Sequence, residues 1–461
     1  MNHTSELARY CAELTYDRLP EEVVAKAKKC ILDYCGIVVG ARKIEASSKV
    51  ADFVRQYGPE GQSSVIGYGF KTTAPLAALA NGTFAEVLEY QDGTRKGGNH
   101  PECAVLPAAM AVAEANGSSG KDFITAVVAG YEAENRVAAA MHPSHLRRGH
   151  LPTGTIGSIG AAVATSRLLG LNPEETSNAV GIAGFVTPMS IGENLWGGYT
   201  IKVVHGGYGA RVGVEAAAWT KAGFTGCPLE GSPVRPDGLC AVASDNPNYG
   251  EFTEGLGERF TILDVYFKPY ACCRVTHSTV EATLSLVLEN DLKPEQIESV
   301  EVTTYDYAAK TVGANYPDSG TNFLKCQFSL PYVVAVGITD RDVSLPQFTS
   351  ERITDAKLLE LSRRVRVVGD EEMNKVWPET RPSRVEIRTT DGKRFVRQVN
   401  YPLGDQRNPL TDEQFWAKFD LLISFGLGEG RSQEIRSKVE LLDAAHDISG
   451  LIESLSPSKI S

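Results

Sequence analysis

Long alanine- and glycine-rich segments in the first half of the chain constrain the fold more than any other feature. They run over residues 74–89, 104–115, 124–141, 155–169, 173–184 and 207–222. Each is long enough for at least three helical turns and is apolar on almost every side. A helix of this kind is buried by other helices, and its small side chains let neighbouring helices approach closely. The pattern predicts a large helical body with internal helices.

Another helix is predicted from Pro20 to Gly40. Proline suits the first helical position and glycine suits the end of a helix. Apolar side chains recur between them with the spacing of one buried stripe, at Val23, Val24, Ala27, Cys30, Ile31, Tyr34 and Val38. A short β-like run at 64–68 follows a Gly-Pro break.

The pattern changes after about residue 267. Residues 300–305 and 364–368 alternate apolar and polar side chains, which indicates half-buried strands. Residues 384–399 form two such runs joined by Asp391-Gly392, a strong hairpin signal. Helical runs at 278–289 and 332–338 lie between these strands. Residues 268–400 are therefore predicted to form a smaller α+β lid domain.

The chain turns helical again past Tyr401. Thr411 and Gln414 form a capping box, and a last helix is expected over 438–455. We expect these helices to return to the first domain. The predicted fold is mainly α: a helical domain of residues 1–267 completed by 401–461, with the lid over 268–400. At roughly 150 residues per domain, a chain of 461 residues has room for both.

Composition excludes several classes of protein. A net charge of −11 argues against a nucleic-acid binder, which carries a basic face. The longest uncharged stretches are too short and too polar to span a membrane, and we see no signal or transit peptide. The nine cysteines have no regular spacing and no CxxC pair, which favours a reducing cytoplasm over disulfides and predicts no metal site.

Histidine 100 lies in a polar, glycine-rich loop between two predicted helices, where a rigid scaffold often holds catalytic groups. The same loop carries Asp92, Thr94, Arg95 and Lys96. A flexible surface loop is the alternative.

Histidine 150 precedes a GxxGxxG run at 154–160. Since no strand precedes the run, close helix packing explains these glycines better than a dinucleotide site.

Two more regions hold candidate residues. Lys202 and His205 share a face if a helix starts there, and an ammonium and an imidazole near a helix N-terminus form a plausible carboxylate pocket. A surface lysine with a capping histidine is the alternative. Arg274 and His277 fall at the expected domain border, where ligands often bind. The sequence shows no nucleophile elbow, HExxH or Walker A motif, so the predicted chemistry is acid–base work.

These stretches, taken together, resemble the MmgE/PrpD family over nearly the whole chain. The resemblance rests on NHPECAVLPA, IKVVHGGYGARVGVEAAAWTKAGFTG, KPYACCRVTH, QFSLPY and YPLGDQRNPLT. It implies a homodimer with an all-helical domain, an α+β lid and a site between them that uses neither metal nor cofactor. Matched residue by residue, that site would hold Thr94, His100, Lys202, His277 and Tyr332, with Asp92 nearby.

The chain departs from the family pattern at two places. The family usually carries a histidine six residues before the glycine that corresponds to Gly157. Here that position is Leu151, and His150 comes one residue early, so either His150 still reaches the site or its role is lost. The loop after Asp92 also differs, because it reads Gly-Thr-Arg-Lys-Gly-Gly. Its two extra cations would suit an additional carboxylate or a different substrate.

The resemblance and the residues together predict a cofactor-independent lyase, a dehydratase or decarboxylase, acting on a small di- or tricarboxylate. His100 and His277 would exchange a proton at a carbon next to a carboxylate, because imidazole titrates near working pH. The expected catalytic set also includes Lys202, Tyr332 and His150. The expected substrate-binding set is Asp92, Thr94, Arg95, Lys96, His205 and Arg274.

Two alternatives to the lyase stay open at this stage. One is an epimerase or isomerase of an amino- or imino-dicarboxylate, which passes through the same carbanion-like state. The other is a non-catalytic binder of organic acids with the same fold. The acidic net charge opposes neither, since salt screens it beyond about 8 Å.

Overall fold

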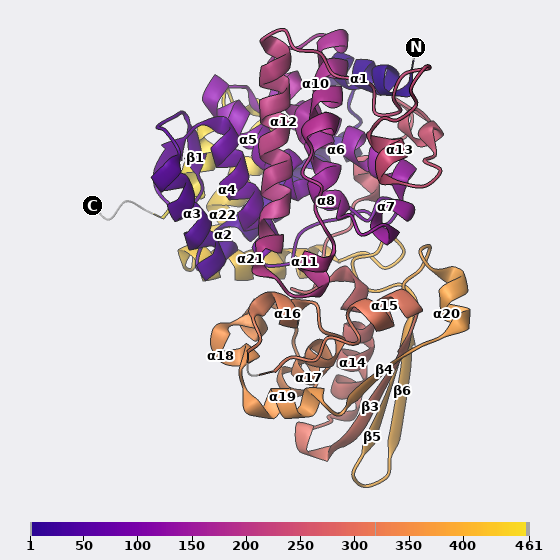
Figure 1. The fold of residues 1–461 in the computed structure, drawn as a ribbon. Coiled ribbons are helices and arrows are strands. Elements are labelled where there is room, and N and C mark those ends of the chain that lie inside the picture. Colours follow the sequence, from indigo (N-terminus) through magenta and orange to yellow (C-terminus); the bar gives the residue numbers. More distant parts are fainter. Residues whose placement is uncertain (1, 319, 458–461) are drawn as a thin grey trace.

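The computed structural model describes residues 2–318 and 320–457 and places them in two parts, a helical body and a smaller lid (Figure 1). The body contains α1 His3–Glu13, α2 Glu21–Ala41, α3 Glu45–Tyr57, α4 Ala74–Val87, α5 Val105–Asn116, α6 Gly120–Met141, α7 Ser144–Arg147, α8 Pro152–Thr155, α9 Gly157–Leu168, α10 Pro173–Val186, α11 Glu193–Trp196, α12 His205–Lys221 and α13 Leu239–Ala243. A short antiparallel pair, β1 Ser63–Val65 and β2 Phe70–Thr72, lies on its edge.

The centre of the body is built from the alanine- and glycine-rich helices. Helix α12 packs against α4 and α9, and α6 packs against α9. The helices approach closely where glycines face each other: a Cβ at Gly82 would lie 2.7 Å from the Cα of Gly207. Close packing is therefore the physical reason for the small residues, and the predicted internal helices are confirmed.

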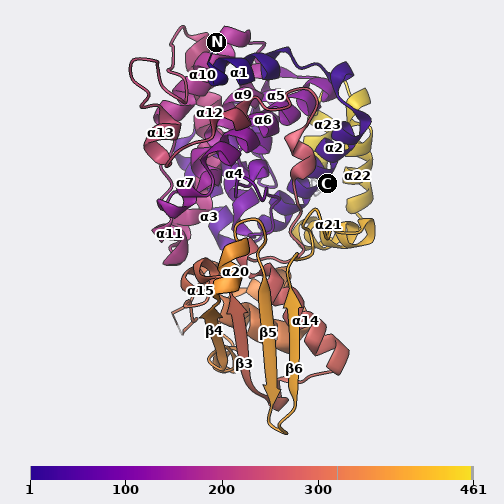
Figure 2. The same ribbon diagram turned by 90° about the vertical axis from the view of Figure 1, so that its right-hand side faces the viewer.

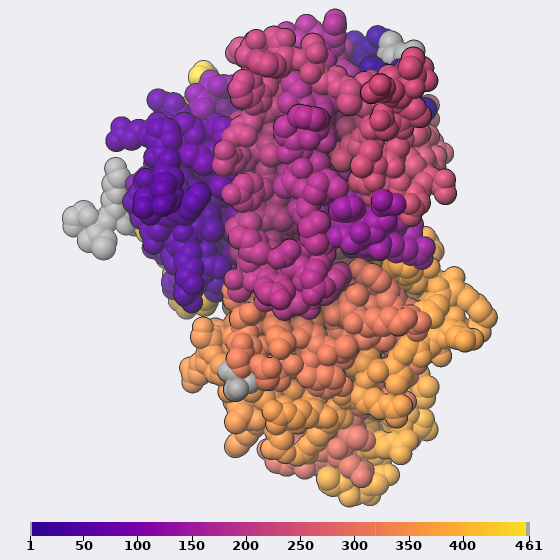
Figure 3. Space-filling view, in the orientation of Figure 1, coloured from indigo at the N-terminus to yellow at the C-terminus, as the bar shows by residue number. Residues whose placement is uncertain are grey.

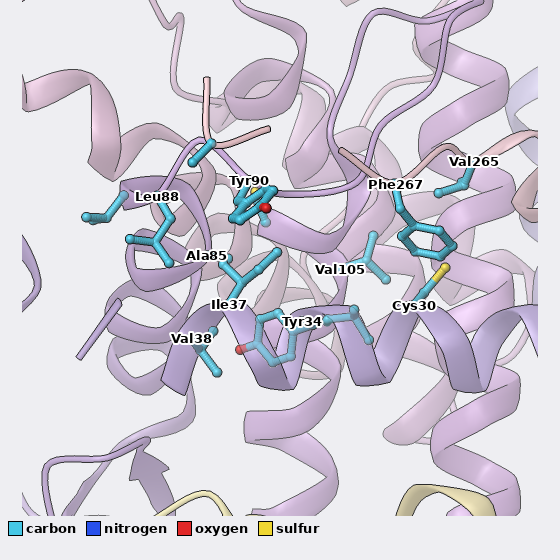
Figure 4. Packing of buried hydrophobic residues seen from close by; sticks show 14 of the residues in the cluster. Cys30, Tyr34, Ile37, Val38, Ala85, Leu88, Tyr90, Val105, Val265 and Phe267 are labelled. Atoms are coloured by element: carbon cyan, nitrogen blue, oxygen red, sulfur yellow. The ribbon is translucent and has the colours of Figure 1, made fainter. Parts of the chain in front are cut away.

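The C-terminal helices, α21 Asp412–Leu427, α22 Ser432–Glu440 and α23 Ser449–Ser454, lie beside the body. Helix α21 packs on α2, where a Cβ at Gly40 would come within 2.8 Å of Leu422. A buried ion pair of 2.7 Å joins Asp33 to Lys418 across the same contact. Figure 4 shows side chains of α2, among them Tyr34, directed toward the core that continues to Phe267.

The lid contains α14 His277–Asn290, α15 Asp306–Thr311, α16 Phe323–Gln327, α17 Leu330–Asp340, α18 Ser350–Ile353, α19 Ala356–Ser362 and α20 Glu371–Val376. Its strands are β3 Ile297–Thr304, β4 Val365–Gly369, β5 Ser383–Thr389 and β6 Arg394–Val399, in the order β4-β3-β5-β6. Strand β3 is parallel to β4 and antiparallel to β5, and β5 pairs with β6 through the predicted Asp391-Gly392 hairpin.

The sheet turns one face toward α14, which contacts β5 and β6 (Figure 2). Buried valines of β3, Val300 and Val302, lie opposite Val365 of β4 and Val385 of β5. The predicted class, a mainly helical protein with an α+β lid, is confirmed. The boundaries at 267 and 401 stay predictions.

Two helix predictions are wrong in detail. The expected helix over 438–455 is broken: α22 ends at Glu440, a turn follows, and α23 begins at Ser449. Asp443 in the turn accepts hydrogen bonds from Tyr16 and Lys28, and Asp447 accepts one from the Ser449 amide. These side-chain bonds compete with helix continuation. The expected helix over 155–169 begins earlier, as the short α8, and continues as α9.

Within residues 2–318 and 320–457, no helix is long and apolar enough to cross a membrane. All nine cysteines are free thiols.

Candidate active site

A cavity of about 90 Å³ lies where the body meets the lid, along the seam seen in Figure 3. Its polar wall is formed by Glu89, His100, Thr153, Lys202, His205, Tyr266, Cys273, Arg274 and Arg381. Its apolar wall residues include Leu146, Leu151, Pro152, Leu195, Trp196, Val275, Tyr307 and Phe328. Since a water needs roughly 10–15 Å³ of such space, the cavity holds about six waters, the room of a small organic acid.

The loop after α4 carries His100 into this cavity. It leaves the helix through Glu89, whose φ of +49° lies in the left-handed region that non-glycine residues rarely adopt. Gly93 and Tyr266 then exchange two backbone hydrogen bonds of 3.1 and 2.9 Å, which tie the loop to the segment leading into the lid. A side chain at Gly93 would come within 2.8 Å of the His100 ring. The contact therefore requires glycine.

The ring of His100 is held in one orientation. Its Nδ1 lies within hydrogen-bonding distance of the Asp92 carbonyl, so the proton sits on Nδ1 and Nε2 keeps its lone pair. The backbone amide of His100 donates to Thr153 Oγ1 at 3.2 Å. Burial, together with the nearby Lys268 ammonium, lowers the pKa of His100 to about 3. The free imidazole is therefore neutral at pH 7.

Lys202 stands between two buried carboxylates. Its Nζ donates to Glu86 Oε2 at 2.7 Å and to Glu89 Oε2 at 2.6 Å. Glu89 also accepts a bond of 2.7 Å from Lys268. The Nε2 of His205 lies 3.2 Å from Glu86 Oε1, without hydrogen-bond geometry.

The lysines keep these carboxylates ionised. Burial alone would raise the pKa of Glu86, but Lys202 and His205 outweigh it and hold the pKa well below its ordinary value. Burial likewise opposes the ionisation of Glu89, yet Lys202 and Lys268 lower its pKa to about 2. The two carboxylates in turn raise the pKa of Lys202 against its own burial. The two glutamates and the two lysines are therefore all charged at neutral pH.

Two arginines complete the positive side of the cavity. Arg274 donates to the Leu403 carbonyl at 2.8 Å, and its guanidinium lies 4.4 Å from the centre of the Tyr266 ring. Arg381 enters from the lid and interacts with the Tyr266 hydroxyl. Four fixed cations at or next to the cavity thus face two carboxylates, leaving two positive charges in excess. Such a site favours a small dianion or trianion.

Four of the sequence-predicted residues meet at this cavity: His100, Lys202, His205 and Arg274. His277 lies directly behind Arg274: its Nδ1 accepts from Arg274 at 3.1 Å, and its Nε2 donates to the Cys272 carbonyl at 3.0 Å. Both ring nitrogens are therefore engaged. Burial and then Arg274 place the pKa of His277 well below its ordinary value.

Other predicted residues lie outside the cavity wall. The hydroxyl of Tyr332 donates to the Gln347 carbonyl at 2.6 Å inside the lid. Asp92 accepts from Tyr131 at 2.9 Å and from the Glu102 amide at 3.2 Å, beneath the His100 loop. His150 turns away and stacks on His145 at 5.0 Å, while its neighbour Leu151 lines the cavity.

The remaining loop residues point elsewhere. Thr94 donates to Asn99 at 2.5 Å, and Arg95 pairs with Glu379 at 2.5 Å. Thr94 and Lys96 border a separate hollow beside Asp264.

Sequence reasoning missed Glu86, Glu89, Tyr266, Lys268, Tyr307 and Arg381. A signal existed for the first two, because they are acidic residues at the end of an otherwise apolar predicted helix, residues 74–89, and acidic residues are rarely buried unless they are paired. Tyr266 and Arg381 carry no comparable signal, since only the tertiary fold brings them together. Among the described residues, no cluster of three or more histidine, cysteine or acidic side chains could hold a metal ion.

The fold and the site define a two-domain protein with a largely cationic cavity between a helical body and an α+β lid. Two family models match it: the MmgE/PrpD N-terminal domain over residues 5–251 and the MmgE/PrpD C-terminal domain over residues 270–444. The chain belongs to the MmgE/PrpD family.

Several named relatives match almost the full length. A cis-aconitate decarboxylase of Aspergillus terreus is 30% identical, over 98% of this chain and 95% of the relative. The cis-aconitate decarboxylase-like protein oryM of Aspergillus oryzae is 28% identical, over 99% and 97%. A cis-aconitate decarboxylase of Mus musculus is 26% identical, over 98% and 93%.

Proposed function

We propose that the protein is a lyase, a decarboxylase or dehydratase, that acts on a small di- or tricarboxylate by proton transfer at a carbon next to a carboxylate, without metal or cofactor. The observation that carries the proposal is the buried cavity with two excess positive charges and a neutral imidazole whose Nε2 is unprotonated. The names of the relatives, found at nearly full coverage, support the same class.

Substrate carboxylates would bind the cationic side of the cavity. Arg274 presents a planar fork that matches a carboxylate. Its orientation is set by the Leu403 carbonyl and by His277. We therefore assign His277 the role of a positioning residue for Arg274, in place of the proton exchange expected from sequence.

The proton chemistry falls to His100 in this proposal. Bound carboxylates bring negative charge near the ring and raise the pKa of His100 from about 3 toward the working pH. In a dehydration, Nε2 would remove the proton next to a carboxylate while the hydroxyl leaves. In a decarboxylation, the imidazolium would return a proton to the carbon that loses carbon dioxide. The buried ammoniums of Lys202 and Lys268 stabilise the negative charge that develops in either case.

The hydroxyl role expected of Tyr332 passes to Tyr307. Tyr307 lines the cavity, and its buried hydroxyl has no hydrogen-bond partner in the described structure. Burial, and then the nearby Cys273, raise the pKa of Tyr307, so the phenol keeps its proton. It would orient the substrate or protonate a leaving hydroxyl.

Turnover in deuterated water tests the proposal. Purified protein is incubated with cis-aconitate, 2-methylcitrate and iminodisuccinate, and products are followed by NMR. We expect loss of carbon dioxide or water from a polycarboxylate, and a rate reduced by on the order of 10²–10⁴-fold in His100→Gln. His446→Gln, on a side chain 98% exposed, is the matched control. Binding without turnover or deuterium entry would indicate a binder, and deuterium entry without elimination an epimerase; either overturns the lyase.

A homodimer in the cytoplasm is part of the proposal. Exposed apolar side chains cluster between the end of α10 and the start of α12, at Phe185, Met189, Ile191, Tyr199 and Ile201. A patch of this kind typically marks a protein contact. Light scattering on the purified chain measures the oligomer, and a monomer at micromolar concentration would contradict this part.

A further inference from the structure

A buried acid outside the cavity wall is tied to the loop that carries His100. We propose that this acid, Glu134, is a positioning residue for His100 and acts on it through Asn99. Glu134 lies on α6, and Asn99 directly precedes His100 in the chain. The inference rests on the proposed function, in which His100 moves the proton, and it adds a residue that is not expected to touch the substrate.

The side chain of Asn99 closes the loop and fastens it to α6. Its Nδ2 donates to Glu134 Oε1 at 2.9 Å and to Asn135 Oδ1 at 3.0 Å. Its Oδ1 accepts from the Thr94 hydroxyl at 2.5 Å, and its backbone carbonyl accepts from the Thr94 amide at 3.0 Å. Both N–H groups and the oxygen of the side-chain amide are therefore used. The residue before His100 is held both by its own loop and by the helix.

Glycines let the loop lie directly on this face of α6. A Cβ at Gly97 would come within 2.6 Å of the Cβ of Ala138, which lies one helical turn after Glu134. Gly98 follows with a φ of +64°, in the left-handed region that glycine adopts without strain. With the backbone this close, a change in the Glu134 side chain is passed to the residues that lead into His100.

The GxxGxxG run at 154–160 packs against the same acid from α9. A Cβ at Gly160 would lie 2.7 Å from the Cβ of Glu134, and a Cβ at Gly157 would lie 3.8 Å from Glu134 Oε2. Larger residues at these two positions would therefore crowd the acid. The glycines thus have a role beyond helix packing in general, because they leave the room that Glu134 occupies.

A carboxyl group is a costly choice at this position. Glu134 is buried, and its Oε2 has no hydrogen-bond partner in the described structure. Burial raises the pKa of Glu134 to about 8, against the hydrogen bond from Asn99, so the group is mostly protonated at pH 7. A leucine or methionine would fill the space without burying an unpaired polar atom. The one thing that these side chains lack is an oxygen that accepts from Asn99.

Loss of this oxygen should misplace the base and leave substrate binding intact. The cations of the cavity, such as Lys202 and Arg274, are held by bonds to other elements. Without its acceptor on α6, Asn99 is free to shift, and the His100 ring shifts with it. A displacement of about 1 Å at a reacting group can cost on the order of 10²-fold in rate. We therefore expect an effect on kcat and little effect on KM.

Kinetics of paired variants test the inference. Glu134→Met removes the acceptor, and we expect kcat to fall about 10–100-fold with KM little changed. Glu134→Gln keeps an oxygen for Asn99 and should stay close to wild type. Adding Asn99→Ala to Glu134→Met should cost little more than either change alone, since both break the same link. Thr125→Val is the control, because Thr125 is buried on the same helix and bonds to the Lys121 carbonyl.

NMR of protein labelled with nitrogen-15 at histidine gives a second readout, which needs no turnover. The signal of the His100 Nδ1–H, which faces the Asp92 carbonyl, is assigned by its loss in His100→Gln. We expect a sharp signal in the wild type and in Glu134→Gln, and a broadened or shifted one in Glu134→Met.

The outcomes separate this inference from the proposed function. Additive losses from Glu134→Met and Asn99→Ala, a Glu134→Gln variant as slow as Glu134→Met, or an unchanged His100 signal overturns the inference and leaves the lyase standing. A wild type without turnover, whose His100 signal changes in Glu134→Met and not in Glu134→Gln, overturns the lyase and keeps the inference. If Glu134→Met fails to fold by circular dichroism, Asn99→Ala alone is the test, and a normal kcat with an unchanged signal would contradict the inference.

Discussion

Two groups of buried carboxyl groups lie close to the loop that carries His100, and they differ in charge. The paired acids, Glu86 and Glu89, border the cavity and are ionised. The floor acids, Asp92, Glu102 and Glu134, lie beneath the loop, and burial raises their pKa values: to about 7 for Asp92, to about 8 for Glu134 and well above the ordinary range for Glu102.

The number of neighbouring cations explains the difference. Lys202 and Lys268 donate directly to the paired acids. In the described structure no lysine or arginine donates to a floor acid, and both carboxyl oxygens of Glu102 lack a hydrogen-bond partner. Equal burial therefore shifts the pKa values of the two groups in opposite directions. The comparison teaches that carboxylate charge is held where cations neutralise it, at the cavity, while the acids next to the loop without such partners keep their protons to higher pH.

Removing the shared cation should have the largest effect. Lys202→Met leaves two carboxylates buried at the cavity with one lysine between them. We expect a loss of about 3–5 kcal/mol in the free energy of unfolding. We also expect kcat/KM to fall by at least about 10³-fold, because the Lys202 ammonium is proposed to stabilise the negative charge that develops at the transition state. Denaturant unfolding and steady-state kinetics measure both. Lys49→Met, on an exposed side chain, is the control, and a stable, active Lys202→Met would remove the distinction between the two groups.

Neutralising one paired acid should have a smaller effect. Glu89→Gln keeps the shape but loses charged hydrogen bonds to two lysines, each worth about 1.5–3 kcal/mol. We expect kcat/KM to fall about 10–100-fold. The measurement is the pH profile of kcat/KM, because the pKa of Lys202 should fall once one of its two carboxylates is gone. An unchanged profile would show that Glu89 acts only in packing.

The two groups should also give stability opposite slopes with pH. The folded pKa of Asp92 is about 7 against an ordinary 3.8, so the folded state keeps a proton that the unfolded chain has lost. The stabilisation that Asp92 adds to the free energy of unfolding is fully present below about pH 4 and declines as the pH rises toward 7. Glu89 has the opposite effect, because its folded pKa is about 2 against an ordinary 4.5. The stabilisation that it adds to the free energy of unfolding is present above about pH 4.5 and is lost as the pH falls toward 2.

The variant Asp92→Asn removes the contribution of Asp92 to the pH dependence of stability. We expect the decline in unfolding free energy between pH 4.5 and 7 to be shallower in the variant than in the wild type. Urea titrations at half-unit intervals measure it. Parallel curves for the two proteins would contradict a protonated Asp92.

The smallest effect is expected at Glu102, a second floor acid. Glu102→Gln replaces a neutral carboxyl group by a neutral amide of the same shape, so stability at pH 7 should change by less than about 1 kcal/mol. Thermal unfolding checks this. A loss as large as that of Lys202→Met would mean that Glu102 is ionised and paired.

The sequence predicted much of the fold because helical periodicity, small-residue packing and the Asp391-Gly392 hairpin are local signals. It predicted four cavity residues because His100, Lys202, His205 and Arg274 lie in distinctive motifs. It expected Tyr332 in the site and left open whether His150 reaches it. In the structure Tyr332 bonds to Gln347 inside the lid and Leu151 lines the cavity instead of His150, and only tertiary contacts decide such orientations. The ion network stayed hidden because its members come from segments more than 100 residues apart.

The backbone pair between Gly93 and Tyr266 has a mechanical consequence. From one side of this bridge the chain runs on to His100, the proposed base, and from the other it runs through Arg274 into the lid. Any displacement of the lid segment at Tyr266 would be passed to the loop through these two hydrogen bonds, so the positions of Arg274 and His100 are mechanically linked. The two side chains that the proposed chemistry needs would then keep their spacing whichever part of the protein moves.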